Sequence, residues 1–343
     1  MVWPGIVGHD SVLDRFRRNL SLGRLASTFL FVGPQGIGKR TTALRLAQSL
    51  LCENTSPSDF DACESCFGCQ HVTARTHPDL TLVEKPEDKS FIPIELLIGD
   101  REHRMREGLC HDISLTPFRG GRRVAIIDDA DRLNQEGANC LLKTLEEPPS
   151  GALIILIGTS EHQQLPTIRS RCQIVRFSPL PERLVADLLR TELSFDDERQ
   201  IASLAARAEG SLHRAVELAD TELEEGRSTL LSRLSQTDFD AVPLTKEITA
   251  FVDAAGKDGT SRRQRLRHVI GAAAGFYRQL MREQAQAGPT GTNSADRFVA
   301  NLSKHWSGGP QPASECLERC LEALAQVDAN ANLATLIACW LDD

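Results

Sequence analysis

The stretch GPQGIGKR, residues 33–40, has the spacing of a phosphate-binding loop in all but its last position. Such loops run glycine, four residues, glycine, lysine and then serine or threonine, and only the final hydroxyl is missing here. Arg40 stands in its place, and the hydroxyl of Thr41 does not replace it, because successive helical residues are turned by about 100°. The backbone N–H groups of the loop and Lys39 still predict phosphate binding. Without the hydroxyl, which normally binds Mg²⁺, we expect weak or absent hydrolysis.

The residues around the loop predict alternating strands and helices. An apolar run at residues 28–32 precedes the loop, and a helical pattern follows it. Two further buried strands are expected at residues 124–128 and 153–157, with the helical stretch NQEGANCLLKTLEE between them. Strands that alternate with helices favour a parallel sheet flanked by helices. We therefore predict an α/β fold for this part of the chain.

The second half of the chain carries a helical pattern, and strand signals fade there. The change occurs after about residue 180, beyond SRCQIVRFSPLP. We predict an α/β nucleotide-binding domain over residues 1–178, a small helical domain over 179–240 and an all-helical domain over 241–343. The longest apolar run, ALIILI, is too short to cross a membrane. The start MVWPGIVGHD does not look like an export signal, so we expect a cytoplasmic protein.

A second acidic motif, RVAIIDDAD, contains the predicted strand at residues 124–128. An apolar strand that ends in Asp commonly supplies the carboxylate that organises Mg²⁺, and Asp128 has this position. The next residue, often a glutamate that orients the attacking water, is Asp129, whose side chain is one methylene shorter. Errors of this size in the position of a catalytic group are costly. Together with Arg40 this predicts a poor Mg²⁺ site, and a solvated strand end is the alternative interpretation of Asp129.

Four of the ten cysteines form the pattern C-x10-C-x2-C-x2-C, at Cys52, Cys63, Cys66 and Cys69. Two-residue spacings let consecutive thiolates turn toward one ion, and four thiolates form the closed tetrahedral shell of a structural Zn²⁺ site. An iron–sulfur cluster is the chemical alternative, but the fourth cysteine lies upstream and no Cys-Pro follows. We predict structural zinc, with His71 nearby rather than as a ligand.

The charge of the chain limits its direct contact with nucleic acid. Of 343 residues, 39 are Lys or Arg and 47 are Asp or Glu, which gives a formal net charge of -8. Non-specific DNA affinity comes mainly from cations that neutralise phosphates. The densest basic run, SRRQRLRH at residues 261–268, lacks interleaved aromatic residues and is interpreted as a solvated helix face. We therefore expect nucleic-acid contacts to be local or shared with partner proteins.

GPQGIGKR, IIDDAD, ANCLLKTLEEPP and LPTIRSRCQ occur in this order, and together they carry a resemblance. Over about residues 5–180 the chain resembles the bacterial DNA polymerase III clamp-loader subunits of the AAA+ superfamily. The resemblance implies an AAA+ domain with a zinc module at about residues 52–72, a helical lid and a helical collar. It also implies a hetero-oligomeric ring with tau/gamma and delta subunits, which sets a sliding clamp on primer–template DNA in replication.

Within that family the departures favour the delta-prime type, which has a decayed site, over the tau/gamma type, which hydrolyses ATP. Besides Arg40 and Asp129, His213 stands where a tau/gamma sensor arginine would be. The SRC motif implies that Arg171 is an arginine finger, acting in trans on the ATP of a neighbouring subunit. A guanidinium suits this task because it is always charged and binds two phosphate oxygens at once. Without the family, Arg169 and Arg171 rank equally, and most arginines are ordinary surface residues.

Three functions therefore remain in view. The leading one is a clamp-loader subunit with little or no ATPase activity of its own, and ATP or ADP stay candidate ligands because Lys39 is retained. The alternatives are an ATP-hydrolysing motor subunit and a zinc-dependent nucleic-acid-binding module. The residues predicted to contact a nucleotide are Gly33, Gly36, Gly38, Lys39, Arg40, Thr41, Asp128, Asp129 and the sensor-like Thr159.

Overall fold

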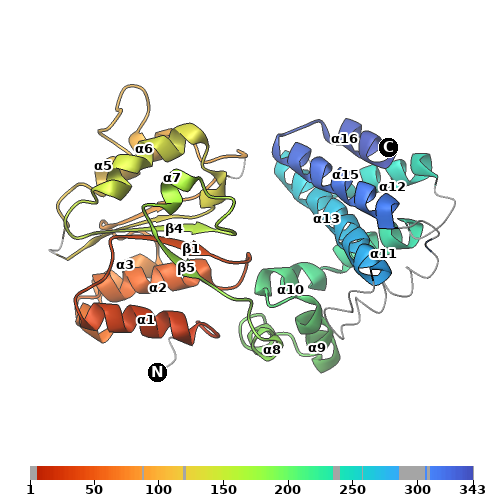
Figure 1. The fold of residues 1–343 in the computed structure, drawn as a ribbon. Helices are drawn as coiled ribbons and strands as arrows, with labels where there is room; N and C mark the ends of the chain where they lie inside the picture. Colours follow the sequence, from red (N-terminus) through yellow and green to blue (C-terminus); the bar gives the residue numbers. More distant parts are fainter. Residues whose placement is uncertain are drawn as a thin grey trace. The chain divides into compact units, whose positions relative to one another are not determined.

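The computed structural model of the chain divides into two compact units, Met1–Leu184 and Val185–Asp343 (Figure 1). The boundary between the two units lies close to residue 178, where the sequence predicts the end of the α/β domain. The further division of the second unit at residue 240 stays a prediction. The structure describes residues 6–86, 89–118, 121–234, 240–256, 258–285, 306 and 310–342.

The first unit is built around a five-stranded sheet in the order β2-β3-β4-β1-β5. All neighbouring strands pair in parallel, which confirms the predicted α/β fold. The sequence predicts the three inner strands; the two edge strands, β2 and β5, have four residues each, too few for a clear apolar pattern. The strands are β1 (Thr28–Val32), β2 (Leu80–Val83), β3 (Arg123–Ile127), β4 (Ala152–Gly158) and β5 (Gln173–Arg176).

Helices cover both faces of this sheet, with α1, α2 and α3 on one face and α5, α6 and α7 on the other (Figure 1). Side chains alternate along a strand, so β4 contributes to two cores. Leu153, Ile155 and Ile157 pack with α1 and α2, whereas Ile154 and Leu156 pack with α4, α5 and α6. These helices are α1 (Asp10–Ser21), α2 (Lys39–Leu51), α3 (Phe67–Thr73), α4 (Glu95–Ile98), α5 (Leu109–Asp112), α6 (Gln135–Glu146) and α7 (Pro166–Arg169), with 3-10 turns η1 (Pro57–Asp59) and η2 (Ala130–Arg132).

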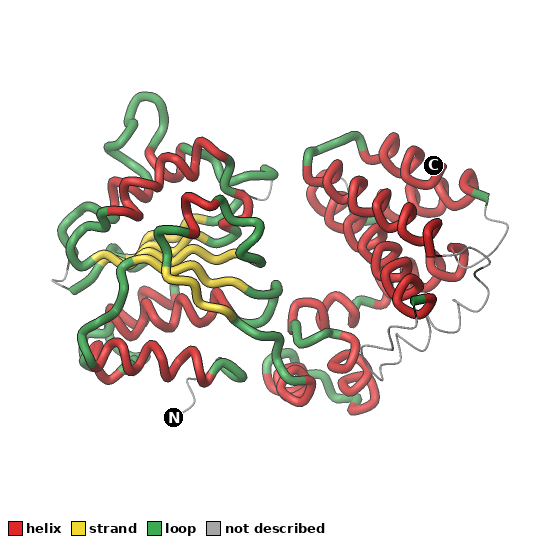
Figure 2. Tube along the Cα trace, in the orientation of Figure 1, coloured by secondary structure: helices red, strands yellow, loops and turns green. Residues whose placement is uncertain are grey.

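The second unit is helical in its described part, as the sequence predicts (Figure 2). Its helices from α11 onward share one core, in which Phe276 of α13 is almost completely buried. Among the described helices of the whole chain, none is both long enough and apolar enough to cross a membrane. The helices are α8 (Glu182–Thr191), which begins before the unit boundary, α9 (Glu198–Arg207), α10 (Leu212–Ala219), α11 (Thr221–Leu234), α12 (Ala241–Asp253), α13 (Gly259–Gln284), α15 (Pro310–Asp328) and α16 (Leu333–Asp342).

Candidate functional site

The glycine-rich loop joins the end of β1 to the start of α2, in the strand–loop–helix context that the sequence predicts. Gly33, Gly36 and Gly38 have φ values of 149°, 71° and 100°, which residues other than glycine rarely adopt. A Cβ on Gly33 would also lie 2.5 Å from the backbone oxygen of Phe177. Gly38 is the N-cap of α2, and no side chain caps the first N–H groups of that helix. Such N–H groups attract anions, so the backbone of the loop is suited to phosphate.

Lys39, the first residue of α2, folds back onto the loop. Its ammonium donates hydrogen bonds to the backbone oxygens of Gly33, at 2.6 Å, and Pro34, at 2.5 Å. Burial lowers the pKa of Lys39, and nearby carboxylates, Asp128 foremost, oppose that shift. The predicted phosphate-binding lysine therefore lies at the loop, and its ammonium group donates hydrogen bonds to carbonyl groups of the loop itself.

Arg40 forms an ion pair that the sequence analysis did not find. Its guanidinium donates to both carboxylate oxygens of Glu84, with Nη1 at 2.9 Å from Oε2 and Nη2 on Oε1. The same Nη1 lies 3.1 Å from Oδ2 of Asp128. The hydrogen bond from Arg40 is the main reason that the pKa of Glu84 is lowered. Thr41, the next residue, is exposed.

Glu84 could not be predicted as a site residue, because it directly follows β2, an edge strand that the sequence pattern did not indicate. The carboxyl ends of parallel strands meet at one edge of a sheet, so Glu84 lies beside Asp128, which follows β3. The stretch DLTLVE, an alternating strand that ends in an acid, is the signal that could have indicated it.

The two predicted acids after β3 have different surroundings. Burial raises the pKa of Asp128, although the Asp129 amide and the charge of Arg40 oppose the shift. That amide lies 3.0 Å from Oδ1 of Asp128. Asp129 itself is exposed and has a φ of 52°, at the N-cap of the turn η2. The structure thus brings Asp128 to Arg40 and leaves the Asp129 carboxylate in solvent.

Thr159 follows β4 and adjoins the loop, since its backbone oxygen accepts a hydrogen bond from the Gly33 amide at 3.2 Å. Both the amide and the hydroxyl of Thr159 donate to Oδ2 of Asp131 at 2.7 Å. The side chain of Gln164 binds the other oxygen of that carboxylate. Asp131 therefore anchors the segment that carries Thr159.

Arg171 lies near the amino end of strand β1, whereas the loop follows the carboxyl end of that strand. Its backbone oxygen accepts a hydrogen bond of 2.8 Å from the hydroxyl of Thr28, the first residue of β1. The loop, in contrast, begins directly after the last residue of β1. A strand rises about 3.3 Å per residue, so the length of β1 separates the two by about 16 Å. Nε of Arg171 lies 2.7 Å from Oε1 of Glu146, and Nη1 lies 2.8 Å from the Thr167 oxygen. The structure therefore does not bring Arg171 to the loop of its own chain.

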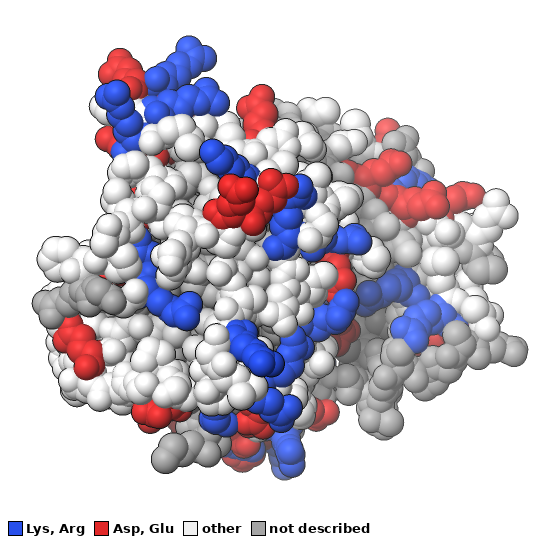
Figure 3. Space-filling view, turned by 60° about the vertical axis from the view of Figure 1, so that its left-hand side comes forward, with Lys and Arg blue, Asp and Glu red and all other residues white. Residues whose placement is uncertain are grey.

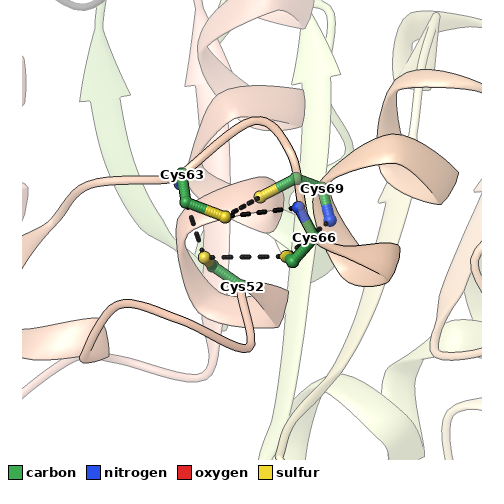
Figure 4. A group of neighbouring side chains, drawn as sticks. All are labelled: Cys52, Cys63, Cys66 and Cys69. Carbon is green, nitrogen blue, oxygen red and sulfur yellow. Dashed lines mark hydrogen bonds between the residues drawn. The ribbon is translucent and has the colours of Figure 1, made fainter.

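The cysteine cluster joins the end of α2 to α3, and its four sulfur atoms point toward one another (Figure 4). All four lie within 4.8 Å of one another. The sulfurs of Cys52 and Cys66 are 3.9 Å apart, and those of Cys63 and Cys69 are 4.0 Å apart. A tetrahedral zinc ion with Zn–S bonds of about 2.3 Å requires sulfur atoms about 3.8 Å apart. The distances therefore suit a metal ion such as zinc.

The thiols of the cluster differ: hydrogen bonds lower the pKa of Cys52 and Cys63, whereas burial raises the pKa of Cys69. The amide of Cys69 lies 3.3 Å from the sulfur of Cys66, and the amide of Cys66 lies 3.3 Å from that of Cys63. Hydrogen bonds, chiefly from Ser65, lower the pKa of Cys63 to about 6. Thiolates are the metal-binding form of cysteine. His71 is occupied elsewhere: its Nδ1 lies 2.9 Å from the Phe67 oxygen.

Gly68, inside the cluster, permits the close approach of α3 to the end of α2. A Cβ at this position would lie 2.1 Å from the backbone oxygen of Leu51, which cannot simply rotate away. We expect Gly68→Ala to destabilise the chain by about 1–3 kcal/mol, the usual range for overpacking. Chemical denaturation followed by circular dichroism measures this. Gly271→Ala is the matched control: this glycine is also helical, a Cβ there meets nothing within 4 Å, and a gain in stability is expected. Equal effects of the two variants would contradict the packing argument.

Comparison with known proteins gives consistent relatives for this chain. The family described as DNA polymerase III, delta subunit, matches residues 8–181. The DNA polymerase III subunit delta' of Bacillus subtilis is 31% identical over 221 residues, which are 64% of this chain and 62% of that protein. The delta' subunit of Pseudomonas aeruginosa is 32% identical over 64% of this chain and 65% of its own length.

Tau subunits match as well, and the one from Escherichia coli is 32% identical over 64% of this chain but only 33% of that protein. The matches thus span less than two thirds of the length of these relatives. Among solved structures, a DNA polymerase III gamma subunit-related protein from Thermotoga maritima has a TM-score of 0.46 at 16% identity, covering 96% of this chain and 97% of that one.

Proposed function

Because this chain belongs to the family described as DNA polymerase III, delta subunit, we propose that it is a delta-prime-like subunit of a clamp loader. In this proposal the chain joins tau/gamma and delta subunits in a cytoplasmic ring of AAA+ subunits that loads a sliding clamp onto primer–template DNA. It contributes an arginine finger to a neighbour and has little or no ATPase activity itself.

The position of Arg171 is the observation that carries this proposal. Arg171 and the phosphate-binding loop lie at opposite edges of one sheet, so the guanidinium cannot serve the loop of its own chain. It can serve only a nucleotide held by another molecule. The side chain of Arg171 is 28% exposed and that of its partner Glu146 is 48% exposed. Ion pairs of this kind contribute at most about 1 kcal/mol, so exchanging Glu146 for a phosphate is inexpensive.

The surroundings of the loop support low turnover by the chain itself. The guanidinium of Arg40 binds Asp128, the residue placed to organise Mg²⁺. Asp129 is exposed at the N-cap of a turn, and its side chain is one methylene shorter than glutamate, which is poor positioning for a group that must orient a water. The tau relatives give the motor-subunit alternative some support. Mg-ATP turnover by the isolated chain that is lost in Lys39→Ala would favour that alternative.

We further propose that the cysteine cluster holds a structural Zn²⁺. Four thiolates leave no open coordination position, so the ion has no substrate and acts by fixing α3 against α2. The competing function, a zinc-dependent nucleic-acid-binding module, finds little support in the surface charge. The formal net charge of the chain is -8, although basic side chains of the described residues gather in the lower central part of the face drawn in Figure 3. Tight, salt-sensitive DNA binding by the chain alone would favour that module.

Reconstitution tests the proposed function. The chain is mixed with tau/gamma and delta subunits, sliding clamp and primed DNA from the same source. We expect it to co-elute with the other subunits on sizing, and the yield of clamps on DNA to fall to background when it is omitted. A ring that assembles and loads clamps equally well without this chain would refute the proposal. Boiled chain serves as the control for non-specific stimulation.

A further inference from the structure

Two carboxylates and one guanidinium meet where strands β2 and β3 end, beside the first turn of α2. Arg40 reaches Glu84 with both terminal nitrogens and Asp128 with one of them. We propose that the Arg40 guanidinium is a built-in replacement for the divalent cation of phosphate-binding loops, so that this site takes no Mg²⁺. The proposal concerns the chain by itself and does not rest on its membership of a ring.

The oxygens present do not form a magnesium shell. Mg²⁺ requires about six oxygen ligands at about 2.0–2.1 Å in near-octahedral geometry. The loop hydroxyl is replaced by Arg40, and the neighbouring Thr41 is exposed. Both oxygens of Asp128 are engaged: Oδ2 by Nη1 of Arg40 at 3.1 Å and Oδ1 by the Asp129 amide at 3.0 Å. The hydroxyl of the loop pattern is therefore missing, and both Asp128 oxygens already have hydrogen-bond partners in the protein.

The second carboxylate, Glu84, is also occupied. Arg40 binds its two oxygens as a fork, and Arg75 lies 3.7 Å from one of them. A planar guanidinium presents its donors in the geometry that a carboxylate accepts, whereas a metal ion would have to displace it. A divalent cation placed here would also be repelled by the positive charge of Arg40.

Apolar side chains strengthen this arrangement. Leu44, Leu82 and Ile126 line the same pocket as the three charged groups. The side chain of Asp128 is 20% exposed and that of Arg40 32%. Less water around opposite charges strengthens their attraction, and an unpaired Asp128 would be costly at such a position. The arginine thus supplies permanently the positive charge that the metal ion supplies elsewhere.

Binding of Mn²⁺, a paramagnetic substitute for Mg²⁺, tests this inference. Free Mn²⁺ is measured by electron paramagnetic resonance in the presence of the full-length, zinc-loaded chain, with and without ADP. We expect the intact chain to bind no Mn²⁺ beyond the amount that ADP binds in the absence of the chain. Arg40→Ser removes the guanidinium and restores the hydroxyl of the loop pattern, so it should gain a bound Mn²⁺. Adding Asp128→Asn to that variant should abolish the gain.

Arg40→Lys is the matched control, because it keeps a positive charge at this position and should leave Mn²⁺ free. Arg40→Gln, which keeps most of the side chain, replaces Arg40→Ser if the latter does not fold. Mn²⁺ bound by the intact chain and lost in Asp128→Asn would overturn the proposal. So would folded Arg40→Ser and Arg40→Gln variants that bind no Mn²⁺. Neither result bears on clamp loading, so failure of this inference is distinguishable from failure of the proposed function.

Discussion

Replacing Arg171 by alanine is expected to reduce ATP hydrolysis by the reconstituted complex while leaving its assembly intact. An arginine finger contributes on the order of 10³ or more to the rate at one site in other phosphoryl-transfer enzymes. Only one of several ATP sites in the ring should face this chain, so the total rate should fall partially, or further if the sites are coupled. Steady-state hydrolysis with clamp and primed DNA present measures the change, and sizing checks assembly.

Arg169→Ala is the matched control for this experiment. Arg169 lies two residues away, and its Nη1 is 3.5 Å from the backbone oxygen of Glu161, so it shares the segment but not the proposed role. We expect little change in the rate with this variant. Arg171→Lys should resemble Arg171→Ala, because a lysine cannot bind two phosphate oxygens as a fork. An unchanged rate with Arg171→Ala, or an equal loss with Arg169→Ala, would remove Arg171 from the mechanism.

Removing the proposed zinc ion is expected to have the largest effect on stability. Structural zinc binds peptides of this ligand type with an apparent free energy of about 10–16 kcal/mol. The loss here should be smaller, because α2 also packs against the sheet, but it should exceed that of Gly68→Ala. We expect purified chain to contain one zinc ion, and Cys66→Ser to lose it together with a large fall in melting temperature. Metal analysis and thermal unfolding measure both.

The control for the zinc experiment is Cys339→Ser. Cys339 is an exposed cysteine on α16, remote in sequence from the cluster, so its substitution should change neither zinc content nor melting temperature. Full zinc content in Cys66→Ser would show that the four cysteines are not a ligand set. Iron and sulfide in place of zinc, visible as brown absorbance, would favour the iron–sulfur alternative.

The sequence predicted those parts of the molecule that depend on neighbouring residues. The loop could be placed because its glycines and Lys39 act through local backbone geometry at a strand–helix junction. The parallel sheet followed from strands that alternate with helices, and its inner strand β4 is buried over its whole length. The cysteine cluster was predicted from spacing alone, because three of its members, including Cys66, lie within seven residues of chain.

The order of the strands determined contacts that the sequence could not predict. Arg40 and Glu84 are 44 residues apart, and only the pairing of β2 with β3 places Glu84 and Asp128 at the same guanidinium. Likewise, the motif of Arg171 names a candidate, but the hydrogen bond from Thr28 shows at which edge of the sheet it lies. Sequence patterns report local backbone preferences, whereas contacts between distant residues depend on how strands are ordered and paired. For this reason the sequence alone determined the loop, the sheet type and the cysteine pattern. Only the tertiary structure decided that two carboxylates hold Arg40 and that Arg171 lies far from the loop of its own chain.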